Sequence, residues 1–189
     1  MRVALISEHY PPMRTSAAIQ MQDLAIELFR QGHEPIVITP SNEINDEWEA
    51  GFMDGIQVLR LTAGRTHKTG SYFLRTLSEF LLPFLMIYKL RKSPYNDLQW
   101  KLIIWYSPSI FFGPLIWKMK RNAGCKTCLI LRDIFPEWAL DLGLIRKGLT
   151  YSFFKLIANF QYSVADTIGV QTQSNLTYLK DWANEPNRK

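Results

Sequence analysis

The amino-acid sequence predicts an α/β fold, with a Rossmann-like, doubly wound and mostly parallel sheet that carries helices on both faces. Short apolar, β-branched segments alternate with longer segments in which apolar residues recur at helical spacing. Such strands pair in parallel, because each helix carries the chain back across the sheet. The 189 residues, 47% of them hydrophobic, fit one domain with its own core.

The chain opens with a predicted strand and helix. Arg2–Ser7 is a short apolar run, which is typical of a buried strand. Thr15 or Ser16 can cap the helix that follows, because a hydroxyl accepts a hydrogen bond from a free amide of the first turn. We expect this helix to end at Gln31-Gly32, where glycine supplies the left-handed closing residue.

Two more strands flank an acidic segment. Pro35–Thr39 reads as the second strand, and we expect Pro40 to end it. Residues 41–55 are acidic and contain glycine, which predicts a surface excursion between the second and third strands. Ile56–Leu61 is the third predicted strand.

The second half of the chain continues the alternation. We expect a helix over Ser71–Lys92 that Pro83 kinks or splits. The remaining predicted elements alternate between strand and helix, in the order Lys101–Tyr106, Ser109–Asn122, Lys126–Leu131, Thr150–Val164, Asp166–Gln171 and Ser174–Trp182.

Ligands of parallel sheets bind beyond the carboxyl ends of the strands. This rule selects four loops, at Glu8–Ser16, Pro40–Gly55, Ser107–Ser109 and Arg132–Gly143. The first loop contains no glycine and the second strand does not end in an acidic residue, so the pattern disfavours a dinucleotide site. A P-loop is absent as well.

Charge is distributed unevenly along the chain. Residues 1–59 carry three basic and nine acidic side chains, residues 60–126 carry twelve and two, and residues 127–189 carry seven and six. The basic middle third interleaves with apolar residues, which favours an anionic membrane surface as a partner. The cations that we expect to face the membrane are Arg75, Lys89, Arg91 and Lys92. Nucleic acid is disfavoured, because no base-reading motif is present.

Neither long apolar stretch of the sequence suits a membrane span. Leu77–Leu90 and Leu102–Trp117 are both interrupted, and both are shorter than the roughly 20 residues that a span needs. No targeting segment is evident. Cys125 and Cys128 alone cannot complete a zinc site, so we expect no metal and a cytosolic, reduced protein.

Three groups of residues resemble one known family. They are Tyr10–Pro12 with Ser16–Ala18, Asp23–Leu28 and Gly32–Thr39, then Arg132–Trp138 with Gly143-Leu144, and finally Asp166–Thr172 with the helix to Leu179. In this order and spacing they resemble glycosyltransferase family 4, whose GT-B architecture sets two Rossmann-like domains across a cleft. Arg132–Trp138 is similar to the branch that transfers N-acetylfucosamine-type sugars in O-antigen or capsule assembly.

The resemblance implies that residues 1–189 are the amino-terminal, acceptor-side domain of a longer enzyme, with the donor-binding domain absent from the chain. It implies retaining, hexosyl-type transfer from a nucleotide-sugar to a polyprenyl-diphosphate-linked saccharide, without a metal or other cofactor. The enzyme would act at the inner face of the cell membrane, and the fragment alone would be inactive. The alternative is a standalone basic module that binds the membrane peripherally without catalysis.

Candidate site residues follow from the predicted loops and the resemblance. Thr15 and Ser16 stand where the family commonly has two glycines; their hydroxyls and the helix N-terminus suit the donor diphosphate, and an ordinary helix cap is the alternative. Asp133 is the candidate catalytic carboxylate, which would accept a hydrogen bond from the acceptor hydroxyl or stabilise positive charge on the transferred sugar. The alternative for Asp133 is a surface pair with Arg132. Candidate acceptor-binding residues are His9, Tyr10, Arg132, Glu137 and Trp138, and His9 would also be able to transfer a proton near neutral pH.

Overall fold

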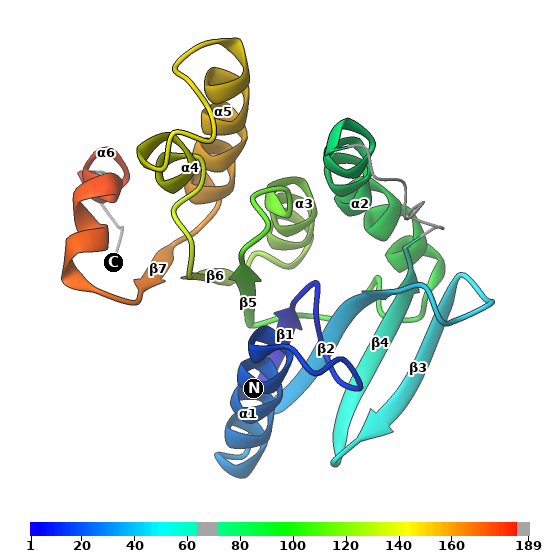
Figure 1. Cartoon of the computed structure of the whole chain (residues 1–189). Helices are drawn as coiled ribbons and strands as arrows, with labels where there is room; N and C mark the ends of the chain where they lie inside the picture. Colours follow the sequence, from blue (N-terminus) through cyan, green and yellow to red (C-terminus); the bar gives the residue numbers. More distant parts are fainter. Residues whose placement is uncertain (64–71, 185–189) are drawn as a thin grey trace.

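The computed structural model describes residues 1–63 and 72–184. Seven strands form one sheet in the order β3-β4-β2-β1-β5-β6-β7, in which β3 is antiparallel and every other neighbouring pair is parallel (Figure 1). The strands are β1 (Arg2–Ile6), β2 (Glu34–Ser41), β3 (Trp48–Met53), β4 (Ile56–Thr62), β5 (Leu102–Ser107), β6 (Lys126–Leu131) and β7 (Thr167–Val170). The helices are α1 (Ser16–Arg30), α2 (Tyr72–Lys92), α3 (Gly113–Ala123), α4 (Glu137–Asp141), α5 (Leu149–Ser163), the 3-10 helix η1 (Gln173–Leu179) and α6 (Lys180–Ala183).

Helices cover both faces of the sheet, as the sequence predicts. Side chains of a strand alternate between the faces, so Val3 and Leu5 pack beneath α1 while Ala4 and Ile6 belong to the core under α2, α3 and α5. Figure 1 shows α1 on one side of the strands and these three helices on the other. This is the predicted doubly wound, mostly parallel α/β fold.

The predicted first helix is confirmed at both ends. The Thr15 hydroxyl accepts from the amide of Ala18 at 3.2 Å, and Gly32 closes the helix with a φ of 78°. Apolar residues of one stripe, including Met21 and Ala25, are buried against the sheet. The fixed start of α1 places its N-terminus beside the carboxyl end of β1.

The prediction for residues 41–55 was incomplete, because β3 lies within that segment as an antiparallel edge strand. Asp54 and Gly55 join β3 to β4 with φ angles of 51° and 79°, which is the backbone of a two-residue hairpin. An Asp-Gly pair is a strong hairpin signal. The strand before it was not predicted because an acidic, half-exposed edge strand lacks the apolar pattern of a buried one.

Pro40 does not end β2, which continues to Ser41. The proline lies beyond the pairing with β1, which stops at Ile38, and only β4 runs alongside it. The N–H that proline lacks therefore costs β2 no hydrogen bond to β1. The helix predicted from Ser109 begins later, at Gly113, where Pro114 occupies a first-turn position that needs no N–H.

Three helical predictions near α2 and the carboxyl terminus also need correction or completion. The described part of α2 runs as one helix through Pro83, and the predicted start at Ser71 lies outside the described residues. The short helix α4 lies inside the loop predicted at Arg132–Gly143. The final predicted helix is mostly the 3-10 helix η1, followed by α6. Within residues 1–63 and 72–184, no helix combines the length and hydropathy needed to cross a membrane.

Candidate functional site

A cavity of about 270 Å³ opens at the carboxyl ends of β1, β2 and β4, beside α2. Its wall combines carboxylates, an imidazole, a guanidinium and hydroxyls with apolar side chains such as Met13, Pro40 and Leu82. The polar side chains that line it include Glu8, His9, Thr39, Glu43, Arg60, Ser78 and Glu79. These donors and acceptors can bond the hydroxyl groups of a ligand, and the apolar part of the wall can pack against its carbon skeleton.

Two carboxylates approach each other across this cavity. Burial raises the pKa of Glu8, the negative charge of Glu79 raises it further, and Arg75 opposes the shift. Glu79 is itself held in an ion pair with Arg75 at 2.9 Å. Glu8 therefore holds its proton to a higher pH than an exposed glutamate, and its carboxyl group can donate to a ligand oxygen as well as accept.

His9 occupies the loop between β1 and α1. The loop is fixed by Ser7, whose buried hydroxyl donates to the His9 carbonyl at 2.8 Å. The His9 Nδ1 lies 3.3 Å from the Thr15 hydroxyl, which also accepts from Ala18. Burial lowers the pKa of His9, so the imidazole is neutral at physiological pH and can accept a proton.

Arg60 ties the far wall of the cavity to the same loop. Its Nη2 donates to the carbonyl of Pro11 at 3.1 Å, although Arg60 itself belongs to β4. Tyr10, one residue earlier, packs into the core beneath α1 and is 3% exposed. Burial and the charge of Asp54 raise the pKa of Tyr10 to about 12, against the opposing effect of Arg60.

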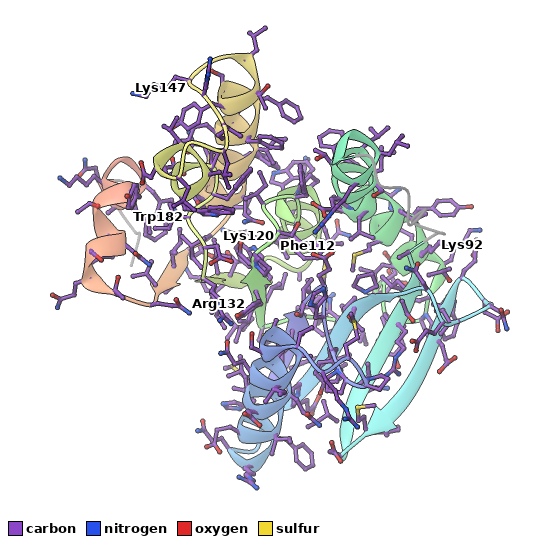
Figure 2. The ribbon with its side chains drawn as sticks, in the orientation of Figure 1. Lys92, Phe112, Lys120, Arg132, Lys147 and Trp182 are labelled. Carbon is purple, nitrogen blue, oxygen red and sulfur yellow. The ribbon has the colours of Figure 1, made fainter. Side chains whose placement is uncertain are left out.

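A second polar cluster lies where β6 ends beside the start of α1. Arg132 Nη1 donates to Ser16 Oγ at 3.0 Å and to the Tyr106 hydroxyl at 2.9 Å. The Tyr106 hydroxyl in turn donates to Gln20 Oε1 at 3.0 Å. The cluster combines a half-buried cation with the positive end of a 15-residue helix, and this arrangement is electrostatically favourable for an anion. Figure 2 shows Arg132 at this edge, beside α1.

The structure brings five predicted residues to the carboxyl edge. His9 and Thr15 contact each other, Ser16 contacts Arg132, and Asp133 follows Arg132 as an exposed residue whose charge acts on that guanidinium. Thr15 takes the helix-cap role that was its alternative, while its bond to His9 still places it at the site. Their roles toward a ligand stay predictions.

Other predicted residues have different surroundings. Glu137 is buried, forms an ion pair with Lys155 and therefore already has a partner inside the chain. Trp138 packs its ring against Phe135 with centroids 5.9 Å apart, and Tyr10 is a core residue. The role of Glu137 in acceptor binding gains no support from this geometry. Tyr10 also lines the cavity and Trp138 is 42% exposed, so their roles stay predictions.

Of the predicted membrane-facing cations on α2, two make ion pairs. Arg75 pairs with Glu79, and Lys92 pairs with Glu47 at 2.7 Å while lying 4.4 Å from the Tyr88 ring centre. Arg91 is exposed and Lys89 is half-buried. These positions leave the membrane prediction open.

Sequence reasoning missed several members of the site. Tyr106 near the end of β5, Arg60 in β4 and the Glu8–Glu79 pair carry no motif, and they meet only through the tertiary structure. The rule that ligands bind at carboxyl ends of strands selects Tyr106, whereas Glu79 comes from a helix and has no such signal. Among the described residues, no three His, Cys, Asp or Glu side chains gather closely enough to hold a metal ion.

Searches by sequence find no matching family model and no matching curated protein. Structural comparison finds a sucrose-phosphate synthase from Thermosynechococcus elongatus, 16% identical, with a TM-score of 0.60 over 100% of this chain and 86% of that chain. It also finds a structure from E. coli described as trehalose-6-phosphate bound with UDP-2-fluoro glucose (14% identity, TM-score 0.61, 97% of this chain and 43% of that chain). A trehalose 6-phosphate synthase from Burkholderia multivorans is 12% identical, with a TM-score of 0.56 over 96% of this chain and 43% of that chain.

These likenesses are likenesses of fold, and they confirm the predicted Rossmann-like half of the GT-B architecture. The chain spans less than half the length of the two trehalose-related structures. Structural similarity of this kind locates the sheet and its ligand-binding edge but does not assign a reaction to the residues there.

Proposed function

We propose that the chain is the acceptor-side domain of a GT-B glycosyltransferase that uses a nucleotide-sugar donor. The observation that carries the proposal is the pairing of two subsites at one sheet edge: a polar cavity at Glu8 and His9, and the cationic cluster of Arg132 at the start of α1. The Thr15–His9 contact connects the two. A sugar acceptor needs hydroxyl-binding groups, and a departing nucleotide diphosphate needs a cation, so the two subsites match the two substrates.

The proposed reaction transfers a sugar between oxygens. The bond from the anomeric carbon to the diphosphate oxygen breaks, and an acceptor hydroxyl oxygen forms the new bond. Its proton passes to the departing diphosphate, with attack on the same face, so that the configuration is retained. Arg132 and the α1 N-terminus would stabilise charge on the diphosphate, while Asp133 would orient the acceptor or stabilise positive charge on the sugar. His9 is neutral and available to hold the acceptor hydroxyl.

The donor sugar itself is proposed to bind mainly to a second domain, beyond residues 1–189. The chain covers less than half of trehalose-related structures, one of which is described with UDP-2-fluoro glucose bound. The segments resembling glycosyltransferase family 4 support the finer assignment to that family and to hexosyl transfer. On this proposal the 189-residue domain has no transferase activity alone.

The acceptor is proposed to be a polyprenyl-diphosphate-linked saccharide of bacterial surface polysaccharide assembly, such as lipopolysaccharide or capsule, reached at the inner face of the cell membrane. The Arg132–Trp138 segment supports this substrate class through its resemblance, and the basic end of α2 supports an anionic surface. The second candidate is a basic peripheral-membrane module without catalysis. The cations and exposed apolar residues of α2 would serve that function equally well.

Turnover by the native gene product tests the proposal, with a panel of nucleotide-sugars and lipid-linked acceptors. Formation of a glycosylated lipid that depends on Asp133 supports the enzyme. A native reading frame that stops at Lys189, together with membrane binding and no transfer, supports the module instead. A frame that continues for roughly 150–200 residues, enough for a second domain, supports the enzyme.

A further inference from the structure

Two helices on one side of the sheet carry exposed apolar stripes. The stripe of α2 recurs at intervals of three and four residues, and that of α5 does the same, which places each set on one side of its helix. We call the two stripes together the apolar face; its residues are Leu74, Leu77, Leu81, Phe84 and Tyr88 on α2 and Leu149, Phe153, Leu156 and Phe160 on α5. Leu149 is 92% exposed and Leu156 is 70% exposed, so neither residue is used by the core of this chain.

The two stripes meet at a groove. Phe84 of α2 and Leu156 and Phe160 of α5 are exposed and line one cavity of about 320 Å³, whose other lining residues are also apolar. The centre of the Phe80 ring lies 6.2 Å from that of the Phe153 ring, so side chains of the two helices contact each other there. The apolar face is therefore one continuous surface rather than two separate ones. A contiguous apolar surface of this kind marks an interaction site.

The loop before α5 extends this surface outward. Leu142 and Leu144 are 70% and 66% exposed, and Arg146 and Lys147 follow them. Figure 2 shows Lys147 at the outer tip of this loop, projecting away from the sheet. Within the described part of the chain, neither Arg146 nor Lys147 forms an ion pair. The tip thus combines exposed leucines with two cations that are available to an external anion.

Charge identifies what covers the apolar face. The segment of α2 contains four basic residues, α3 contains three and residues 142–163 contain three. Arg75, Lys92, Lys120 and Lys155 form ion pairs, whereas the other six cations form none within the described part of the chain. A second copy of the chain would bring two such cationic surfaces together, which is unfavourable. Anionic headgroups match the cations, and acyl chains match the leucine and phenylalanine side chains.

We infer that the apolar face and the 142–149 loop form a docking surface for an anionic lipid bilayer. This deepens the proposed function, because a lipid-linked acceptor lies in that bilayer. Residues Ser78, Glu79 and Leu82 of α2 line the polar cavity, so the helix that contacts lipid also borders the acceptor subsite. The surface differs from the one expected from sequence: α5 and its loop contribute to it, and Arg75 and Lys92 are held in ion pairs.

Sedimentation with vesicles tests the surface without any sugar transfer. The chain is mixed with vesicles of phosphatidylcholine alone, or of equal parts phosphatidylcholine and phosphatidylglycerol. We expect binding to the second kind only. Because each cation near an anionic surface contributes about 1 kcal/mol, Arg146→Glu with Lys147→Glu should weaken binding at least about 30-fold. Leu149→Ser with Leu156→Ser should weaken it about 10-fold by removing inserted apolar surface.

Matched pairs elsewhere on the surface serve as controls. Arg30→Glu with Lys101→Glu reverses two exposed cations outside the three basic segments, and Phe52→Ser with Leu176→Ser removes two exposed apolar side chains outside the apolar face. Circular dichroism and thermal unfolding verify that every variant folds. The inference is overturned if the test pairs bind like their controls, or if phosphatidylglycerol makes no difference. A dimer in sedimentation velocity that Leu149→Ser with Leu156→Ser dissociates would also overturn it, because a second copy would then cover the face. Neither result depends on whether the native protein transfers sugar.

Discussion

Arg132 Nη1 lies 3.0 Å from Ser16 Oγ and thereby joins the end of β6 to the first residue of α1. The two residues are 116 positions apart in sequence. The contact brings the guanidinium of half-buried Arg132 to a helix N-terminus, where partial positive charge already resides on unpaired amides. Together, these two sources of positive charge would stabilise the negative charge that develops on a departing diphosphate.

Replacing Arg132 with methionine should lower kcat/KM of the complete protein by about 100-fold, because one preorganised donor to the leaving group is lost. Tyr106→Phe removes only the hydroxyl that accepts from Arg132, and a smaller loss is expected from misplacement of the guanidinium. Steady-state kinetics measure both. Arg30→Met, at the far end of α1, is the control. Equal activity of the Arg132 and Arg30 variants would remove Arg132 from the anion subsite.

Asp133→Ala should abolish transfer in the complete protein while leaving the fold intact. Asp133 is exposed, and surface substitutions of this kind change the free energy of unfolding by no more than about 0.5 kcal/mol. The pair of measurements is turnover and the urea midpoint. Near-normal turnover would exclude Asp133 as the catalytic carboxylate, and Asp133→Asn separates the loss of charge from the loss of the side chain.

The fold follows from the sequence more fully than the site does. Alternating apolar and helical periodicity is a local property, so six strands and the start and end of α1 could be predicted, whereas the edge strand β3 lacks a buried face and escaped notice despite Asp54-Gly55. Topology predicted the edge at which His9, Thr15 and Ser16 gather.

The contacts within the site could not be predicted in the same way. Whether a side chain turns toward the cavity or the core depends on packing across the sheet. Tyr10 lies next to His9 in sequence, yet its ring enters the core under α1 because apolar neighbours are available there. Glu137 forms an ion pair with Lys155, a residue of α5 that no sequence motif connects with it. Such pairings arise from tertiary structure alone.

The lowered pKa of His9 predicts that the protein loses both activity and stability as the pH falls. Burial lowers its pKa, so the folded protein binds a proton there less readily than the unfolded chain does. Its contribution to the free energy of unfolding is therefore present above pH 6.5 and decreases as pH falls through that value toward the folded pKa. Urea titrations of the wild type and His9→Gln across this range measure the difference. A constant gap between the two curves would show that His9 does not titrate differently on folding.

The raised pKa of Glu8 predicts a pH dependence of stability in the opposite direction. Its pKa is raised by burial and then by Glu79, so the folded state favours the protonated form. Its contribution is fully present below pH 4.5 and is lost as pH rises through the folded pKa. Glu8→Gln should therefore stabilise the protein near neutral pH, and this advantage should disappear in acid. Glu43→Gln, an exposed carboxylate at the same cavity, is the matched control. A Glu8→Gln variant that is less stable at neutral pH would contradict the assignment.

Asp166 should be a strong point of attachment between α3, β6 and β7. Its Oδ1 accepts from Lys120 Nζ at 3.0 Å, and its Oδ2 accepts from the amide and the hydroxyl of Thr127 at 2.8 and 2.9 Å. Burial alone would raise the pKa of Asp166, but the bonds from Lys120 and Thr127 outweigh it and the pKa is lowered. The stabilising contribution is therefore present above pH 3.8 and is lost as pH falls through the folded pKa.

Asp166→Asn retains the size of the side chain but loses the charge that Lys120 and Thr127 recognise. We expect it to lower the free energy of unfolding by about 1–3 kcal/mol near neutral pH, with a smaller difference in acid. Asp23→Asn, exposed on α1, is the control. Thermal unfolding at several pH values measures both variants. An equal unfolding temperature of Asp166→Asn and Asp23→Asn at neutral pH would contradict this role of Asp166. The reason is that a half-buried carboxylate with three hydrogen bonds should not lose its charge without a measurable change in stability.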